Sequence, residues 1–542
     1  MKFIKYIFAL SLIIPSVVRA QKDTSKPGSV TITSAYKPTL IDPVKINLQA
    51  SQLPVDTVRK VNAYNVPDRI LNFSYQPVTL KALPMAIDST IQFGTRRYVK
   101  AGFGNYSTPY GEVGLSFGDG KKSLLNLNAL AYSSKNSSTK FMQSGYLGAG
   151  AQGIFLMNEH ELHGGLDIES NRHYLYGSDF SLRPNATLDD VKQVHTNVGI
   201  NLGITNVSEN SLGINYDPTI KVNFFSYSGK LNESNFLLKA PFSKKFNDKF
   251  IGKLTLMLDN SSVKSVGSFP SVDVENLWQI TPEIIYTREQ IKVEAALSAA
   301  HVNSLQLLPK VVVETRTNDD RFGIRAGVEF SYFRNTLLHH TKINPYIGQL
   351  TASKATKQSE FFAMITSTLA NHFEVSAKAS WLSYNNLAVY IPDTTKLLKG
   401  MSLDYADKAS NFRISGEIKY DMQNKFFLSG SIAINGYNSF KGLNGPYGLI
   451  PLEVNVGAKY KVLDRLDICA KLYSFTGPLY TLSKGRDKNL PSAFDVSFGA
   501  EYRINKRFSA WAEANNLSKT YQRFYNYKTY GPNFLGGVIF KF

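Results

Sequence analysis

The feature that most constrains this chain is an alternation of apolar and polar residues, which runs from about residue 97 to the last residue. Phe412, Ile414 and Ile418, for example, alternate with polar residues such as Arg413. Side chains on a β-strand point to opposite faces in turn, so each such segment has one apolar and one polar face. The segments are about ten residues long and are separated by turns, which is typical of transmembrane β-barrel strands.

A soluble β-sandwich shows the same alternation, with the apolar face buried in its core. Two features favour a membrane barrel, in which the apolar face meets lipid and the polar face lines a wet interior. Short and long connections alternate along the chain. Aromatic residues also stand at strand ends beside short turns, where an interfacial girdle is expected: Tyr420, Phe426, Tyr460, Tyr502 and Phe508. The sequence therefore predicts an all-β, transmembrane antiparallel barrel rather than a soluble secreted protein.

The short turns allow the strands to be counted. They are predicted at 118–122, 157–161, 205–211, 244–249, 288–291, 316–321, 370–373, 421–425, 462–465 and 505–507. Each turn joins two strands and the first and last strands are added, so the count is about 22, within a range of about 16 to 22. Longer connections, expected to face outward at the opposite end, lie at 334–358, 384–409 and 474–492.

The first twenty residues predict a secretory signal peptide. Lys2 and Lys5 precede a short apolar run, and Val18 and Ala20 supply small residues before a cut ahead of Gln21. No later stretch approaches the 18 or so consecutive apolar residues of a membrane helix. We therefore expect export to the outer membrane of a Gram-negative cell, with cleavage near Ala20 and a barrel over residues 96–542.

Residues 21–95 differ from the barrel because they are rich in proline, which prevents regular helix and central strand. The prolines are Pro27, Pro38, Pro43, Pro54, Pro67, Pro77 and Pro84. The segment also carries apolar side chains such as Tyr64 and Phe73, which a solvated linker does not need. It is interpreted as an extended periplasmic or lumenal leader that docks in the lumen or on a partner, with a plain disordered leader as the alternative.

The last strand gives the most specific signal. Phe534, Val538, Phe540 and Phe542 fall on one face, and the chain ends on the last of them. This pattern resembles the terminal strand that the barrel-insertion machinery recognises in outer-membrane proteins. That pattern usually has a polar residue where this chain has Gly536.

The preceding residues resemble the end of a TonB-dependent receptor barrel. The resemblance rests on Trp511-Ala512-Glu513-Ala514-Asn515-Asn516-Leu517, on Tyr521, and on Tyr530-Gly531-Pro532 before the last strand. Such receptors have 22-stranded barrels and take up substrates too large to diffuse through porins. The resemblance therefore implies transport of a solute across the outer membrane.

The chain departs from that family in having no room for a folded plug domain, since only residues 21–95 precede the barrel. A short alternating run in this leader is similar to the coupling box that pairs with a TonB-type energiser. The possible coupling or docking segment consists of Val30, Thr31, Ile32, Thr33 and Tyr36. An ordinary extended segment is the alternative. A barrel of this width has to be closed, and the leader is the only occluder within the chain that the sequence suggests.

No motif in the chain indicates enzymatic chemistry, a cofactor or a metal. The single Cys469 excludes a disulfide framework and a cysteine-rich metal site. The run 148–153 spells a dinucleotide fingerprint, but no helix signal follows, so it is interpreted as small residues on a strand. The pair His339-His340 is expected to be solvated in a loop. The net charge of +19 is spread along the chain, so nucleic acid is not an expected partner.

The polar strand face is the expected functional surface. The lumen-lining candidates are Arg413, Glu417, Lys419, Glu453, Lys459, Asp467, Lys471, Asp495, Glu501 and Arg503. Charges of both signs can hold a bound segment or filter solutes. Alternatively, they pair with one another and only solvate a wet lumen.

Two functions remain open from the sequence. The first is a TonB-dependent-receptor-like barrel that transports a solute. The second is a non-transporting barrel subunit of an outer-membrane assembly or secretion complex, which docks partners through residues 21–95. Expected partners are outer-membrane lipid and lipopolysaccharide, the insertion machinery, and a TonB-type energiser or other outer-membrane or periplasmic subunits.

Overall fold

The computed structural model describes residues 97–542 apart from 120, 179, 182–183, 209, 268–270, 350–351, 370–371, 393–399, 423–424 and 483–486. The expected signal peptide, the leader and the candidate coupling segment at 30–36 lie outside the described residues.

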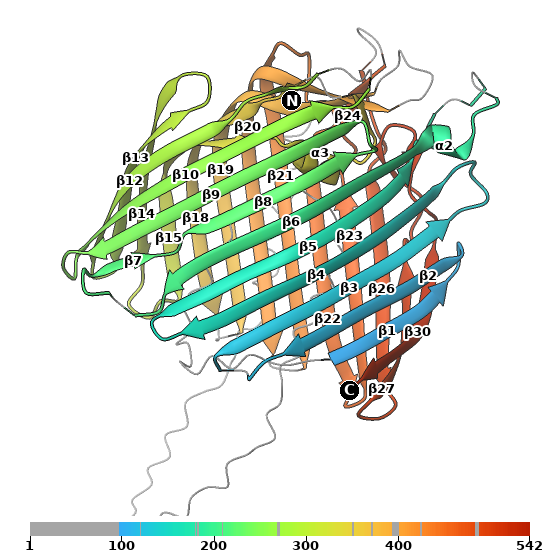
Figure 1. The fold of residues 1–542 in the computed structure, drawn as a ribbon, viewed down its shortest axis with the longest axis horizontal. Helices are drawn as coiled ribbons and strands as arrows, with labels where there is room; N and C mark the ends of the chain where they lie inside the picture. Colours follow the sequence, from blue (N-terminus) through green and yellow to red (C-terminus); the bar gives the residue numbers. More distant parts are fainter. Residues whose placement is uncertain are drawn as a thin grey trace, which may run out of the picture. The chain divides into compact units, whose positions relative to one another are not determined.

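The described residues form a closed antiparallel barrel of 22 strands, as the alternation predicts (Figure 1). Each strand pairs with its neighbours in the chain, and β1 closes the ring by pairing with β30, with Tyr98 opposite Lys541. The barrel strands are β1 (Arg97–Gly104), β2 (Thr108–Phe117), β3 (Ser123–Lys135), β4 (Gln143–Met157), β5 (His160–Tyr174), β6 (Lys192–Asn206), β8 (Thr219–Tyr227), β9 (Leu231–Lys245), β10 (Phe250–Ser265), β12 (Leu277–Arg288), β13 (Ile291–His301), β14 (Leu305–Arg316), β15 (Phe322–Arg334), β18 (Ala355–Leu369), β19 (Phe373–Pro392), β20 (Met401–Met422), β21 (Phe426–Lys441), β22 (Leu452–Leu463), β23 (Leu466–Phe475), β26 (Ala493–Arg503), β27 (Phe508–Asn515) and β30 (Asn533–Lys541).

Shorter helices and strands lie in the connections between the barrel strands. They are α2 (Leu188–Val191), α3 (Leu337–Ile343), β7 (Ile214–Tyr216), β11 (Asp273–Val274), β16 (Ile347–Gln349), β17 (Ala352–Ser353), β24 (Leu479–Thr481), β25 (Asp487–Asn489), β28 (Gln522–Phe524) and β29 (Tyr527–Lys528). Neither helix in the described part of the chain has the length and apolar character needed to cross a membrane.

The apolar face of the strands points out of the barrel. On β14, Leu305, Leu307 and Val311 are 61, 60 and 46% exposed, while the intervening Leu308 and Val312 are buried. Apolar area left in water costs about 25 cal/mol per Å², so a continuous outer surface of this kind is stable only against hydrocarbon. The barrel is therefore a membrane barrel, and the soluble alternative is excluded.

All ten predicted short turns join consecutive barrel strands at one end, here called the turn end. The connection after β6 is longer than predicted because it contains β7, which pairs with β9. The predicted aromatic girdle is also present at this end. The rings of Tyr420 and Phe426 lie 5.8 Å apart, those of Phe426 and Tyr460 6.2 Å, and those of Phe508 and Phe540 4.9 Å.

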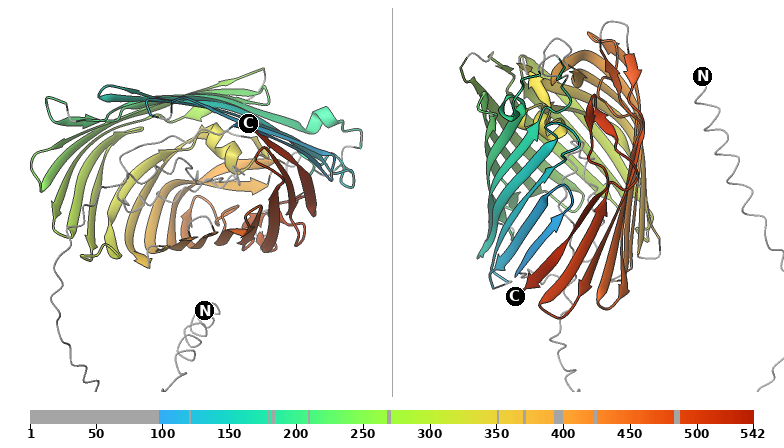
Figure 2. Two further views of the ribbon diagram at one scale, coloured as in Figure 1. Left: turned by 90° about the horizontal axis from the view of Figure 1, so that it is seen from below. Right: turned by 90° about the vertical axis from the view of Figure 1, so that its right-hand side faces the viewer.

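The longer connections lie at the opposite end, here called the loop end. The prediction of a loop at 384–409 was wrong, because β19 continues to Pro392 and β20 begins at Met401. The connection predicted at 334–358 lies at this end, as expected, and part of it folds into the barrel, because α3 lies inside the ring of strands (Figure 2). The run 148–153 lies within β4, as interpreted from the sequence.

The opposite faces of β21 give a direct test of the lipid-facing surface. Ile432 points outward and is 40% exposed, whereas the neighbouring Ser431 points inward between Glu417 and Asn455. Ile432→Arg is expected to lower the free energy of unfolding from lipid vesicles by about 2–4 kcal/mol. Ser431→Arg, at the same depth, is expected to change it by less than about 1 kcal/mol. Equal losses in urea titrations would contradict an outward lipid-facing surface.

Candidate functional site

Among the described residues, the α3 segment, residues 335–348, lies inside the barrel at the loop end (Figure 2). Its sequence carries the signals of a short helix. Thr336 caps the first turn, its hydroxyl accepting a hydrogen bond from the His339 N–H at 3.1 Å. At the other end the Asn344 N–H donates to the His340 carbonyl, and Pro345 follows.

The first turn of α3 is held by a carboxylate from the barrel wall. Glu233 on β9 is 1% exposed. Its Oε1 accepts from the Leu337 N–H at 2.9 Å and its Oε2 from the Leu338 N–H at 3.0 Å, and Ser261 donates to the same carboxylate. These N–H groups have no partner within the helix, so the wall supplies the hydrogen bonds that the short helix lacks.

A second buried charge fixes the start of the segment. The Arg334 guanidinium, 3% exposed, forms an ion pair with Asp259 at 2.7 Å. It also donates to the side-chain oxygens of Asn276 at 3.2 Å and Asn235 at 3.3 Å. A buried arginine is stable only when it is paired and hydrogen-bonded. These interactions therefore fix the position of the chain where it leaves β15.

His340 lies at the centre of the contact between α3 and the opposite wall. The expectation that His339-His340 is solvated was wrong, because His340 is fully buried. Its Nδ1 lies 3.1 Å from the Tyr390 hydroxyl and its Nε2 3.2 Å from the Tyr405 hydroxyl. Burial lowers the pKa of His340 well below its ordinary value, so the imidazole is neutral in the folded protein.

An apolar core crosses the lumen through the α3 segment. It joins the β8–β9 hairpin, α3 with β16, and the extended ends of β19 and β20. Its buried members are Phe225, Tyr227, Leu231, Val272, Leu337, Ile347, Tyr390, Met401, Leu403 and Tyr405. The Tyr227 hydroxyl donates to the Ile347 carbonyl, and Ile347 pairs with Met401 in a short parallel ladder.

A second core packs against the α3 segment at the loop end. Tyr346 from the α3 segment stacks on Tyr527, with ring centroids 3.7 Å apart. Around this pair lie buried residues from the end of β5 and from the β5–β6 and β27–β30 connections: Tyr174, Leu175, Val191 and Phe524. We call the two cores together the cap. The cap extends across the lumen and was not expected from the sequence, so the leader is not the only candidate occluder within the chain.

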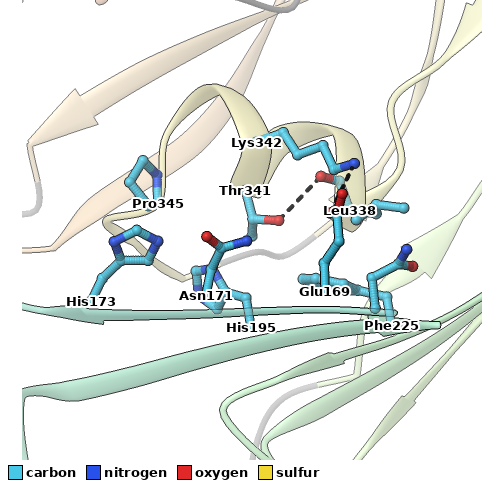
Figure 3. Close-up of a pocket in the computed structure, with 10 residues that line it drawn as sticks. Glu169, Asn171, His173, His195, Phe225, Leu338, Thr341, Lys342 and Pro345 are labelled. Atoms are coloured by element: carbon cyan, nitrogen blue, oxygen red, sulfur yellow. Dashed lines mark hydrogen bonds and ion pairs between the residues drawn. The ribbon is translucent and has the colours of Figure 1, made fainter. Parts of the chain in front are cut away.

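A small polar pocket separates α3 from the inner wall of β5, β6 and β8 (Figure 3). Its volume of about 40 Å³ is enough for a few water molecules. Lys342 reaches across it to Glu169 at 3.3 Å. The buried His195 Nε2 and Asn197 Oδ1 line it without a hydrogen-bond partner in the described part of the chain. This side of α3 is therefore polar and incompletely bonded, whereas the side toward Tyr390 and Tyr405 is dry.

Below the cap, the inner wall carries charges that are mostly paired. Lys310 lies 2.8 Å from Glu283 and 3.0 Å from Glu294, and Arg325 lies 3.5 Å from Glu294. Inner-wall Lys253 is 37% exposed and Arg325 32%. The wall is therefore reached by solvent, in contrast to the cap.

The lumen-lining candidates alternate with exposed apolar residues and so lie on the inner strand face. Of the ten, the structure brings Asp467 and Arg503 together as an ion pair. Others pair with residues that were not singled out: Glu501 with Lys541 at 2.7 Å, Lys419 with Glu374 at 4.0 Å, and Glu453 with the Tyr473 hydroxyl at 3.2 Å. The remaining candidates, at inner-face positions of β20, β22, β23 and β26, are Arg413, Glu417, Lys459, Lys471 and Asp495.

The residues of the terminal pattern lie on the outer face of β30. Phe534, Val538 and Phe542 are 53, 54 and 58% exposed, and the Phe540 ring lies 5.6 Å from that of Phe542. Among the described residues, no group of three or more His, Cys, Asp or Glu side chains is arranged to hold a metal ion.

The residues that build the cap were missed from the sequence. Glu233, Arg334 and Tyr346 carry no motif, and Glu233 lies 104 residues before Leu337. One local signal was available for α3 itself. Thr336 before Leu337-Leu338, with Pro345 beyond the helix, is a helix start and stop pattern.

The barrel is similar to solved outer-membrane transporter and receptor structures. It matches the FrpB iron transporter from Neisseria meningitidis with a TM-score of 0.63 at 11% identity, covering 84% of this chain and 82% of that one. It matches the siderophore receptor PirA from Acinetobacter baumannii with a TM-score of 0.62 at 10% identity, covering 83% and 81%. It matches the copper transporter OprC with a TM-score of 0.58 at 10% identity, covering 83% and 81%.

These similarities confirm the predicted fold, the barrel of TonB-dependent receptors. At such low identity they concern the fold alone. No protein-family model matches the sequence, and no curated protein sequence matches it.

The burial of His340 predicts a pH dependence of the cap. When the segment is released, the imidazole titrates near its ordinary pKa of about 6.5. In the closed form it stays neutral, because the groups that face it are the uncharged Tyr390 and Tyr405 hydroxyls, and His339, whose own pKa burial lowers. The cap is thus fully stable above about pH 6.5 and loses stability below it.

Ion conductance of the purified protein in planar bilayers is therefore expected to rise between pH 7 and pH 5. His340→Gln keeps hydrogen-bonding groups but cannot be protonated, so its conductance is expected to vary less with pH. His163→Gln, a histidine on the barrel wall that is not part of the cap, serves as the control and is expected to behave as the wild type. A pH response that His340→Gln retains in full would contradict this role.

Proposed function

We propose that this chain is a transport barrel, similar to TonB-dependent receptors, that passes a solute through its lumen when the α3 segment moves. The observation that carries the proposal is a 22-strand ring with a solvent-reached inner wall, across which the chain's own connections pack at the loop end. A ring of this size leaks unless it is closed. A closure built from a connection can move without disturbing the strands that hold the barrel together.

The proposal places the protein in the outer membrane of a Gram-negative cell. Short turns face the periplasm in such barrels and longer loops face outward, so the cap lies on the outer side. Residues 1–20 would direct export, with cleavage near Ala20. The exposed Phe534, Val538 and Phe542, together with Phe540, would be recognised by the insertion machinery.

The solute is proposed only as a class, molecules too large for porins. The similar structures are described as an iron transporter, a siderophore receptor and a copper transporter. Those substrates are stated for those proteins only. For this chain, a TonB-type energiser is proposed to act through Val30, Thr31, Ile32, Thr33 and Tyr36. The ten lumen-lining candidates would form part of the path below the cap.

The two sides of α3 suggest how the path opens. The side toward β19 and β20 is held by a dry core and by the His340 hydrogen bonds. The side toward β5 and β6 has a polar pocket, one ion pair and unpartnered polar atoms. Polar groups that lack partners gain hydrogen bonds when water enters. We therefore expect α3 to part first from β5 and β6.

A second function, a non-transporting subunit of an outer-membrane complex, is favoured by a different observation. The α3 segment is fixed by the buried Glu233, Arg334 and His340. Attachment through this many buried polar interactions is compatible with a permanently closed barrel. In that case residues 21–95 would dock partner proteins.

A disulfide lock separates the two functions. Ile347 on β16 and Met401 on β20 are partners in a parallel ladder, so cysteines at both positions are close enough to bridge. In a Cys469→Ala background, the transport proposal expects reversible conductance steps at urea concentrations that leave the barrel folded, because a gate is less stable than the strands. Oxidation of the Ile347→Cys/Met401→Cys protein should abolish these steps, and reduction should restore them.

The control places cysteines at Ile414 and Ile434, which are partners on β20 and β21 and do not touch α3. Its conductance steps should persist after oxidation. Absence of steps in the reduced proteins would contradict a movable gate. The complex hypothesis instead expects stoichiometric companions in detergent extracts of the wild type, and their loss from a chain lacking residues 21–95.

A further inference from the structure

The turn between β9 and β10 carries an aromatic ring that folds back onto the outer surface of the barrel. The Phe246 N–H donates to the Phe250 carbonyl at 3.0 Å. The Asn247 side-chain oxygen accepts from the N–H groups of Lys249 and Phe250, both at 2.9 Å. The turn is therefore well defined by its own hydrogen bonds, and Phe246, 68% exposed, is presented on its outer side.

The Phe246 ring lies over Gly252, which has no side chain to obstruct it. A Cβ atom at Gly252 would come within 2.6 Å of the Phe246 ring. Beside the ring is an apolar groove of about 270 Å³. It is lined by Phe246, Asn247, Phe250, Ile251, Gly252 and Ile284. The groove is thus a feature of the lipid-facing surface that depends on a glycine.

Positive charge borders this groove. Gly252 pairs with Lys244 on one neighbouring strand and with Ile284 on the other, and Lys244 shares the outward face with Phe242. Lys244 and Lys249 are exposed, and neither ammonium has a partner among the described residues. Lys245 is paired with Asp248 at 2.8 Å. One ammonium group, that of Lys244, therefore lies on the outward face beside the apolar groove, and a second, that of Lys249, is carried by the turn next to it.

We propose that this groove binds one anionic glycerophospholipid of the leaflet at the turn end. An acyl chain fills the apolar groove between Phe246, Phe250 and Ile284, and the phosphate lies near Lys244 and Lys249. Apolar lining suits the chain, and lysines at the membrane surface attract anionic headgroups. The site rests on the barrel's place in a bilayer and not on transport.

A second turn of the same geometry provides the comparison. Between β26 and β27, the Ile504 N–H donates to the Phe508 carbonyl at 2.9 Å. The Asn505 oxygen accepts from the N–H groups of Arg507 and Phe508 at 2.8 and 2.9 Å. This turn is also basic, with Lys506 and Arg507.

The surface beside the second turn lacks the two features on which the proposed groove depends. Ala510 stands in the place of Gly252, so a Cβ occupies the position over which Phe246 folds. Its strand partners are Tyr502 and Val538, where Gly252 has Lys244 and Ile284. The second turn thus has the same backbone hydrogen bonds and basic residues as the first. It lacks the counterparts of Gly252 and of the outward-facing Lys244.

The experiment is lipid retention by the full-length protein in detergent. The protein is incubated with equal amounts of phosphatidylglycerol and phosphatidylcholine, and bound lipid is counted by native mass spectrometry. The wild type is expected to retain one phosphatidylglycerol with about a tenfold preference. Lys244→Gln/Lys249→Gln should reduce the preference to about twofold, and Lys506→Gln/Arg507→Gln should leave it unchanged.

Gly252→Ala is expected to displace the ring and reduce retention of both lipids. If that variant does not fold, as judged by heat-modifiable migration, Phe246→Ala removes the ring without altering the strand and should have the same effect. Equal retention of the two lipids by the wild type would overturn the proposal. Equal losses in the two double variants would also overturn it, because binding would then follow basic charge at any turn. This experiment measures lipid binding and not solute passage. Its result therefore neither supports nor contradicts the transport proposal.

Discussion

The closure of the sheet on itself is the constraint on which the rest of this structure depends. Hydrocarbon offers no hydrogen bonds, so a sheet in a membrane must pair every edge. Here β1 and β30 pair along nearly their whole length, from Tyr98 opposite Lys541 to Gly104 opposite Leu535. Closure at 22 strands satisfies the backbone, but it also encloses a wide interior. The cap lies across this wide interior at the loop end.

The cap is specified by buried polar groups rather than by apolar contact alone. An apolar core crossing a lumen could slide, because hydrophobic contact has no direction. Glu233, Arg334 and His340 remove that freedom, since each would be left buried and unsatisfied in another register. The same groups make the closed state conditional. Protonation of His340 would weaken it while leaving the strands of the barrel intact.

The sequence predicted those parts of the fold that repeat. Alternation located the strands and all ten short turns, because the lipid face imposes the same pattern on every strand. It misjudged 384–409, since β19 and β20 continue at the loop end with paired buried residues such as Tyr390 and Leu403 on one face. It gave no sign of the cap, whose contacts join distant segments. The lumen-lining candidates could be placed on a face, but their partners, such as Lys541 for Glu501, depend on strand neighbours that periodicity does not identify.

The pairing of the inner-wall charges bears on where a solute could be recognised. Lys310 between Glu283 and Glu294, and Asp467 beside Arg503, satisfy one another, so a solute that bound any of these groups would have to compete with an existing ion pair. The pocket beside α3 is different, because His195 and Asn197 each keep a polar atom without a partner there. A group that bonded both atoms would make hydrogen bonds that the closed form leaves unmade, in the pocket that the Lys342–Glu169 ion pair spans. Recognition and release of α3 would then occur at one place, on the side where the segment is held least.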